Sequence, residues 1–229
     1  MSCQKYRHEL KYLITQNDVD LLKTRLSGIM QLDKHTSENG IYNISSLYFD
    51  DYYNRCYYEN LSGVDPREKY RIRIYNHDTS RISLECKRKE RGKTLKTACL
   101  ITAEECDMFM KGRITAEPSA SPVINKFQNE IRQKGLRPAV IVEYDRIPYV
   151  YKCGNVRVTL DMHLSSSKDT DKFLYGKITR RPVMPAGMQL LEVKYDELIP
   201  DYIYNALQLD NLCQTAFSKY FLCRKYSLR

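Results

Sequence analysis

Six segments of the chain alternate charged residues with apolar or aromatic residues at a period of two. Successive side chains of a β-strand point to opposite faces, so this period predicts strands with one charged face and one apolar face. In the second segment, for example, Arg71 and Arg73 share one face and Ile72 lies on the other. The six segments are residues 6–14, 69–75, 83–89, 142–148, 156–161 and 190–196.

Five further segments have helical spacing or helix-start signals: residues 15–30, 102–111, 122–134, 201–211 and 215–225. Thr102 followed by Glu105 is a capping-box pattern, and Ser121-Pro122 is typical of a helix start. If these helices cover the apolar faces of the strands, the charged faces point at one another. The α+β chain then forms a closed antiparallel barrel with a polar interior and flanking helices. An ordinary half-buried sheet, with its charged face in solvent, is the open alternative.

No internal repeat or Gly/Ser/Pro-rich linker divides the chain, so residues 1–229 are expected to form a single domain. The loops are expected at residues 33–40, 117–121 and 165–171, which are short and polar.

The overall composition excludes several classes of protein. A hydrophobic fraction of 42% with 19 Tyr and 6 Phe is too high for a disordered chain. No apolar run approaches the roughly 18 residues of a membrane span, and the N-terminus lacks the apolar core of a secretory signal, so a cytoplasmic protein without a membrane segment is expected. The eight cysteines include no C-x-x-C pair, which disfavours a zinc site and favours reduced thiols. The net charge of +9 indicates an anionic partner.

The charged faces together hold an excess of cations. Glu9, Glu85 and Asp161 are expected to pair with neighbouring Arg or Lys side chains. Because burying even one unpaired ion costs several kcal/mol, a dry interior is excluded. The cavity therefore suits water and an anion of high charge density, such as a triphosphate, and one or two carboxylates can hold a divalent cation. Ten cations and four carboxylates are expected inside: Arg7, Lys11, Arg71, Arg73, Lys87, Lys89, Arg146, Arg157, Lys194 and Lys219, with Glu9, Glu85, Asp161 and Glu192.

Eight short motifs in order resemble those of the VTC (vacuolar transporter chaperone) catalytic domain, over nearly the whole chain. These are Arg7-His8-Glu9-Leu10-Lys11-Tyr12, Ser46-Leu47-Tyr48-Phe49-Asp50, Arg71-x-Arg73, Glu85-Cys86-Lys87, Tyr144-x-Arg146, residues 157–161, Leu191-Glu192-Val193-Lys194 and Ser218-Lys219-Tyr220. That family contains polyphosphate polymerases and belongs to the triphosphate tunnel metalloenzyme (CYTH-like) superfamily. The resemblance implies an eight-stranded antiparallel β-barrel tunnel.

The resemblance also implies roles for individual residues. Glu192 would bind a divalent metal, Mn2+ or Mg2+, and Lys219 would lie near the transferred phosphoryl group, with Ser218 beside it at the tunnel end. Arg7 stands where the superfamily's Glu-x-Glu-x-Lys signature has its first glutamate, which is typical of the polymerase branch. The expected catalytic residues are Lys219, Arg71, Arg73 and Lys87, and the expected substrate-binding residues are Arg7, Lys11, Lys89, Tyr144, Arg146, Arg157, Lys194 and Ser218.

The implied activity is transfer of the terminal phosphate of ATP to a growing polyphosphate chain, in a metal-dependent phosphotransferase reaction. ATP and polyphosphate are the expected partners, and no nucleic acid is expected because the basic residues alternate within strands. Two alternatives stay open: a metal-dependent triphosphate hydrolase, and a non-enzymatic module that binds polyphosphate or another polyanion.

Overall fold

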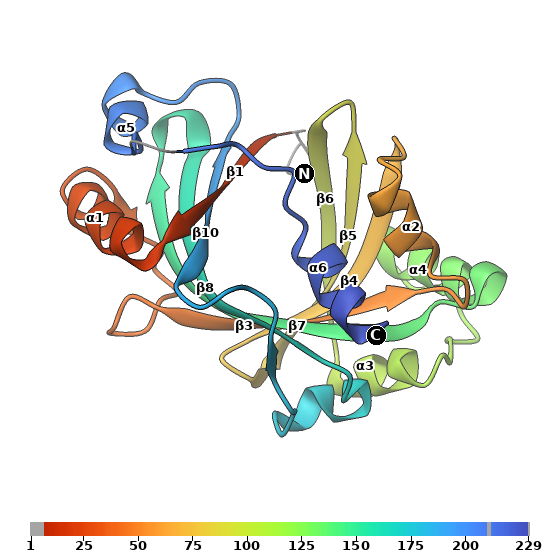
Figure 1. Ribbon diagram of the computed structural model, residues 1–229. Helices are drawn as coiled ribbons and strands as arrows, with labels where there is room; N and C mark the ends of the chain where they lie inside the picture. Colours follow the sequence, from red (N-terminus) through yellow and green to blue (C-terminus); the bar gives the residue numbers. More distant parts are fainter. Residues whose placement is uncertain (1–6, 210–211, 229) are drawn as a thin grey trace.

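One long antiparallel sheet forms the framework of the protein. The computed structural model describes residues 7–209 and 212–228. Two short strands, β2 (Gln31–Leu32) and β9 (Arg181–Pro182), pair with β7 and β8. The sheet curls so that its two edge strands face each other across a hollow (Figure 1). In spatial order its main strands are β1 (His8–Thr15), β10 (Met188–Tyr195), β8 (Val156–Ser167), β7 (Arg137–Tyr151), β3 (Tyr42–Asp50), β4 (Arg67–Tyr75), β5 (Asp78–Glu90) and β6 (Lys93–Ile101).

The expected closed barrel is wrong: the sheet is a curled half-barrel of these eight strands. Between residues that the structure describes, its edges meet at one isolated bridge, where Arg7 and Thr94 exchange backbone hydrogen bonds of 3.2 and 3.3 Å. Further along β1, the chain near the C-terminus takes the place of β6. Gln214 bridges to Tyr12, and the Thr215 amide donates to the Lys11 carbonyl at 2.8 Å. Because this segment occupies the free edge of β1, the ladder between β1 and β6 does not continue.

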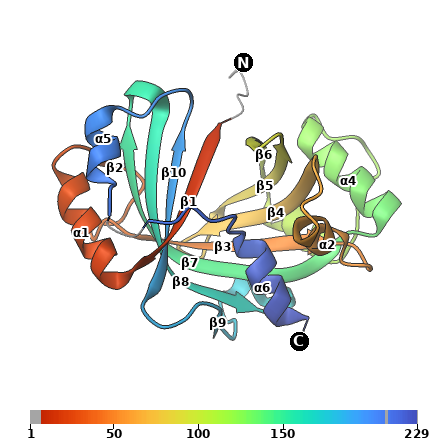
Figure 2. The same cartoon turned by 45° about the horizontal axis from the view of Figure 1, so that its top comes forward.

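Helices cover the convex, outer face of the sheet on both walls of the half-barrel. Helix α1 (Gln16–Ser27) buries Val19, Leu22 and Leu26, which recur at helical spacing, against β1, β8 and β10. Helix α5 (Asp201–Ala206) packs beside α1 on that wall, whereas α4 (Pro122–Lys134) lies beyond β4 and β5 (Figure 2). Helix α3 (Ala103–Met110) shares with α4 the core under β4 and β5. These helices take the apolar side of the strands and leave the charged side to the hollow.

Helix α6 (Lys219–Ser227) lies on the concave side instead. Its Tyr220 and Cys223 are buried against Val142 and Tyr144 of β7. The Asp50 carboxylate at the end of β3 accepts hydrogen bonds from the Tyr220 hydroxyl and from the first turn of α2 (Arg55–Leu61). One buried carboxylate therefore fixes both helices, and it places the start of α6 at the hollow.

Most of the expected helices are confirmed, with shifted ends. The helix at 122–134 begins and ends as predicted, and the Thr102 capping box is present. Helix α1 is capped by Thr15 with Asp18. The C-terminal helix begins at Lys219 rather than at residue 215, because the chain before it pairs with β1. Helix α5 ends at Ala206, and Asn211, at the end of that predicted helix, lies outside the described residues. Part of the loop predicted at 165–171 continues strand β8 to Ser167.

Candidate functional site

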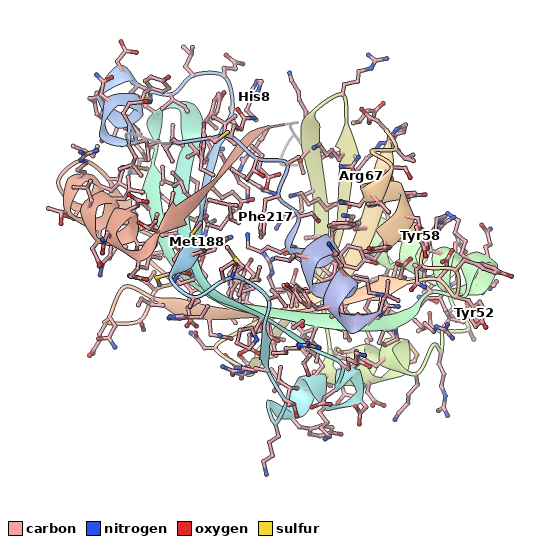
Figure 3. All side chains as sticks on the ribbon, viewed as in Figure 1. His8, Tyr52, Tyr58, Arg67, Met188 and Phe217 are labelled. Carbon is pink, nitrogen blue, oxygen red and sulfur yellow. The ribbon has the colours of Figure 1, made fainter. Side chains whose placement is uncertain are left out.

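The concave face holds a cavity of about 720 Å³. Among the residues that the structure describes, ten cationic side chains line it, against three carboxylates. Figure 3 labels one of the cations, Arg67 at the start of β4, and Phe217 in the segment that leads into α6. Such an excess of like charge is stable only in water or around an anion. The cations are Lys11, Arg67, Lys69, Arg71, Arg73, Lys87, Lys89, Arg146, Lys194 and Lys219, and the carboxylates are Glu9, Asp65 and Glu192.

Strand β4 supplies a row of four of these cations. Arg67, Lys69, Arg71 and Arg73 are two residues apart and therefore share one face of the strand. The neighbouring strand β5 extends the row, since Lys87 stands opposite Lys69 in the register. The result is a band of positive charge along one wall of the cavity.

Glu85 balances part of this band from β5. Arg71 donates to Glu85 Oε2 through Nε at 2.8 Å and through Nη2 at 2.6 Å. Arg73 lies farther from that carboxylate, at 3.9 Å, and its Nε donates to the Ser46 hydroxyl at 3.1 Å. Burial would raise the pKa of the Glu85 carboxyl, but Arg71 and Arg73 outweigh it and hold that pKa well below its ordinary value. Arg73 is therefore a buried guanidinium whose charge is only weakly neutralised.

Glu9 lies among three lysines that line the cavity with it. Its carboxylate is 2.8 Å from Lys87 Nζ, 3.5 Å from Lys11 Nζ and 3.7 Å from Lys194 Nζ. Burial would raise the pKa of Glu9, but the lysines, Lys87 first among them, lower it to about 2. Burial also lowers the pKa of Lys87 to about 8, against the attraction of Glu9.

A third cluster joins β7, β8, β10 and α6. Arg146 holds Asp161 with two hydrogen bonds, of 2.6 and 2.7 Å, and Lys219 Nζ lies 2.6 Å from the same carboxylate. Arg146 also lies 3.2 Å from Glu192, which in turn is 3.1 Å from Lys194 Nζ. Burial would lower the pKa of Lys219, but Asp161 and Glu192 raise it above its ordinary value, so this ammonium stays charged.

Most of the residues expected at the site lie together on this cavity. The expected ion-pair roles of Glu9, Glu85 and Asp161 are confirmed. The cavity lining includes Lys11, Arg71, Arg73, Lys87, Lys89, Tyr144, Arg146, Glu192, Lys194, Ser218 and Lys219.

Arg7 and Arg157 do not line the cavity. Arg7 pairs with Asp196 at 3.0 Å and its side chain is 45% exposed. Arg157 pairs with Asp33 at 3.0 Å and donates to the Tyr42 hydroxyl at 2.7 Å. By the alternation of side chains along a strand, both residues belong to the inner face. Their ion pairs with Asp196 and Asp33 hold the side chains away from the cavity.

Arg67 and Lys69 were missed by sequence reasoning. Both lie on the cavity wall of β4, where Lys69 is two residues and Arg67 four residues before Arg71. The period of two that identified Arg71 and Arg73 extends to them, so the signal was present in the sequence. Tyr48, which accepts a 2.8 Å hydrogen bond from Arg71, gave no such signal.

The carboxylates of the cavity fit a divalent cation that is shared with phosphate oxygens. Glu9 and Glu192 each influence the pKa of the other and share two ammonium neighbours, Lys11 and Lys194. Mg2+ and similar ions bind through one or two carboxylates plus substrate phosphates. Within residues 7–209 and 212–228, no group of three or more His, Cys, Asp or Glu side chains could hold a metal by itself. The donor set therefore suits a metal that arrives with its anion.

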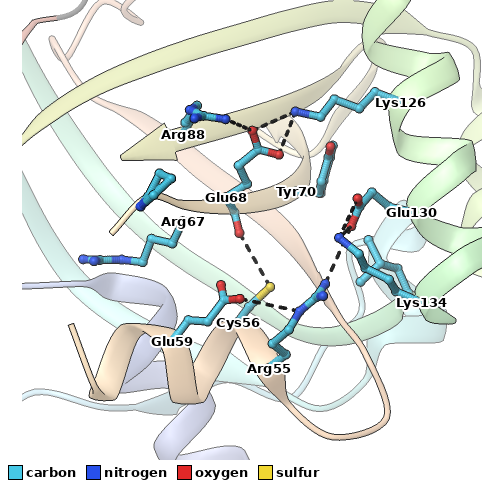
Figure 4. A pocket seen from close by; sticks show the side chains of 12 residues that line it. Arg55, Cys56, Glu59, Arg67, Glu68, Tyr70, Arg88, Lys126, Glu130 and Lys134 are labelled. Atoms are coloured by element: carbon cyan, nitrogen blue, oxygen red, sulfur yellow. Dashed lines mark hydrogen bonds and ion pairs between the residues drawn. The ribbon is translucent and has the colours of Figure 1, made fainter. Parts of the chain in front are cut away.

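A second pocket, of about 300 Å³, lies outside the hollow between α2, β4 and α4. It is also lined by basic residues, but acidic neighbours neutralise most of them (Figure 4). Arg88 and Lys126 both pair with Glu68, at 3.2 and 2.7 Å, and Lys134 pairs with Glu130 at 2.7 Å. The cavity on the concave face is the stronger candidate site because its cations outnumber its carboxylates so widely.

The sequence matches the family model described as the VTC domain over residues 6–228, nearly the full length. This chain belongs to the VTC domain family. No curated protein matches the sequence significantly.

The fold of this VTC domain is similar to the folds of solved structures from other organisms. A Hippeastrum protein, described as a candidate adenylyl cyclase with a dominant triphosphatase activity, is similar with a TM-score of 0.55. The match covers 96% of each chain at 15% identity, so it shows the fold alone. A candidate adenylate cyclase from Bacillus halodurans is similar with a TM-score of 0.49 at 13% identity, covering 90% of this chain and 87% of that one.

No helix in the described part of this VTC domain is long and apolar enough to cross a membrane.

Proposed function

We propose that this VTC domain transfers the terminal phosphoryl group of ATP to the end of a polyphosphate chain. The observation that carries the proposal is the cavity itself, where ten cations and three carboxylates of the described residues form the lining. Many Arg and Lys side chains in one cavity favour binding of a polyanion, because both side chains form charge-assisted hydrogen bonds with phosphate oxygens. Cations line both walls, from β4 and β5 on one side to β1, β7 and β10 on the other, so a donor and an acceptor anion can be held together.

In the proposed reaction an ionised terminal oxygen of the chain attacks the γ-phosphorus of ATP in line. A new P–O bond forms, the bond from the γ-phosphorus to the β,γ-bridging oxygen breaks, and ADP leaves with the electron pair. The attacking oxygen carries no proton, so no general base is needed. The domain's own contribution is to align the two anions and to cancel their repulsion. Arg71, Arg73 and Lys87 are proposed to hold phosphates, and Lys219 the transferred group.

The carboxylates have two different roles in this proposal. Glu85 and Asp161 orient arginines, as their short ion pairs indicate. Glu192, with Glu9 beside it, would hold the divalent metal, Mn2+ or Mg2+. The metal would supply positive charge to the oxygens of the donor triphosphate. Lys11 and Lys194 already bridge the two carboxylates and would keep them aligned toward the phosphates.

Triphosphate hydrolysis is the second candidate function. It is favoured by the similarity of the fold to a protein described with a dominant triphosphatase activity. The two reactions differ in whether water or a phosphate oxygen reaches the terminal phosphorus. The same cavity serves both, and only the products distinguish them.

Incubation with ATP and Mn2+, followed by sizing of the phosphate products on a gel, tests the proposal. Transfer is expected to give ADP together with a ladder of polyphosphate, and no product when the metal is chelated. ADP with free phosphate in equal amounts and no ladder would make the domain a hydrolase. Salt-sensitive binding of polyphosphate with no ADP formed would make it a binding module and overturn both enzymatic readings.

Arg73 and Arg157 were both expected on the inner face of the sheet, but only Arg73 lines the cavity, so they form a matched pair of substitutions. Arg73→Ala is expected to weaken binding of tripolyphosphate without metal by about tenfold or more, because a buried and weakly neutralised guanidinium is lost. Arg157→Ala is expected to change the affinity by less than about twofold, since Asp33 and Tyr42 hold that side chain away from the cavity. Isothermal titration calorimetry at fixed salt measures both. Equal losses in the two variants would contradict the inner-wall assignment of Arg73.

A further inference from the structure

Lys69 of β4 extends into the cavity and contacts two helices. Its Nζ donates to Asn60 Oδ1 of α2 at 2.6 Å and to the Oγ of Ser218, the N-cap of α6, at 3.4 Å. The ammonium also lies 4.9 Å from the centre of the Tyr220 ring. Both hydrogen-bond partners are neutral, so these contacts orient the ammonium without neutralising it.

The charges that surround Lys69 are mostly positive. Arg67 precedes it on the same strand, Lys87 lies opposite on β5, and Lys11 faces it from β1. The other titratable groups near it are Cys56 of α2 and Tyr220 of α6. Among the described residues no carboxylate lies within 4.0 Å of Lys69, whereas four other lysines of the cavity each have one: Lys11, Lys87, Lys194 and Lys219.

This environment disfavours the charged form of the side chain. Burial first, and then Arg67, lower the pKa of Lys69 to about 7. A lysine held in this way gains most from an anion, because an anion replaces the lost hydration and relieves the repulsion from Arg67 and Lys87. A phosphoryl unit at this place would also lie near the N-terminal end of α6, whose dipole favours an anion.

We propose that Lys69 is a further phosphate-binding residue of the cavity, that it holds one phosphoryl unit of the chain beside Asn60 and Ser218, and that it takes up a proton as that unit binds. The proposal rests on the proposed function, in that it assumes a phosphate chain in this cavity. It adds a subsite on the wall formed by β4 and β5, where Arg67 of β4 and Lys89 of β5 also have no carboxylate within 4.0 Å in the part of the chain that is described.

The pH dependence of binding follows from the proton uptake. Below pH 7 the free Lys69 is already charged, so its contribution to affinity is independent of pH. Above pH 7 the free side chain is neutral and must gain a proton, so affinity falls as pH rises, until the pH reaches the raised pKa of the phosphate-bound form. Protonation of the ligand adds its own dependence, but it is the same for every variant.

The test is calorimetric titration of tripolyphosphate at pH 8, without metal, in two buffers with different ionisation enthalpies. Lys69→Met is expected to bind about 5- to 20-fold more weakly and to take up nearly one proton less than the unaltered protein. Lys69→Arg is expected to retain most of the affinity but to lose the same proton uptake, because arginine is charged in both states. Lys126→Met, which removes an exposed lysine paired with Glu68 in the outer pocket, is expected to bind within about twofold of the unaltered protein.

Thermal unfolding separates this role from a structural one. Removal of a buried, unneutralised ammonium is expected to leave the Tm of Lys69→Met unchanged or raise it. If Lys69→Met does not fold, the Lys69→Arg protein decides: unchanged proton uptake overturns the proposal. If the unaltered protein does not bind tripolyphosphate at all, the proposed function fails first. If it binds and Lys69→Met binds equally well with equal uptake, only the role of Lys69 is refuted.

Discussion

Lys219→Ala is expected to lower the turnover of ATP at saturating substrate by a factor of about 10² to 10³. Lys219 is the first residue of α6, and its ammonium points into the cavity beside Asp161 and over the Tyr144 ring. Its raised pKa keeps it positive through the neutral range, so it can stabilise charge that develops as a phosphoryl group is transferred. Because binding is shared among ten cations, the affinity for tripolyphosphate is expected to fall by less than about tenfold.

The fold is expected to survive this change, because Asp161 keeps both hydrogen bonds from Arg146. Lys225→Ala, at an exposed position on the same helix, is the matched control and is expected to turn over ATP at the normal rate. Initial rates of ADP release and the Tm of both variants measure the effect. Normal turnover in Lys219→Ala would remove Lys219 from the catalytic group.

Glu192→Gln is expected to lower metal-dependent turnover by a factor of about 10² or more while leaving the anion bound. The carboxylate is buried beside Arg146, Lys194 and Lys11. Burial would raise its pKa, but Lys194 first and then Lys219 hold that pKa well below the ordinary value. Removing its charge leaves the cations less neutralised. Metal-free affinity for tripolyphosphate is therefore expected to stay the same or to increase, whereas the loss of a metal ligand removes turnover.

Calorimetry without metal and a rate assay across Mn2+ concentrations measure the two effects separately. Glu85→Gln is the informative comparison, because Glu85 orients Arg71 and is not expected to hold the metal. Its turnover is expected to show the unaltered dependence on Mn2+ concentration. Full turnover in Glu192→Gln, or the same shift of metal dependence in both variants, would contradict the role given to Glu192.

Local patterning predicted the parts of the fold that depend on one strand or one helix at a time. Period-two alternation identified the strands with a charged face, and capping signals identified α3 and α4. Strand β3 shows no such alternation. Nearly all of its residues are buried, because α6 covers one face of the strand and the outer core covers the other. The alternation therefore predicts no strand there, although residues 46–50 form one of the motifs that carry the family resemblance.

The positions of side chains within the site were predicted less completely. The alternation of side chains assigns a residue to one face of the sheet, but it does not show which neighbouring side chains that residue contacts. Arg157 shares the inner parity with Arg146, yet Asp33, from a loop distant in the sequence, holds it outside the cavity. Lys69 has the parity of Arg71, and only the packing of α2 and α6 around it gives it an unusual chemistry.

The sequence alone determined that this chain has an antiparallel sheet with one cationic face and helices for the other, because alternation and capping are encoded within a few residues. The tertiary structure decided that the sheet stays a half-barrel, since Gln214 and Thr215 occupy the edge of β1. It also decided which cations are neutralised and which are not. Both outcomes depend on contacts between residues far apart in the chain, and no local pattern encodes those contacts.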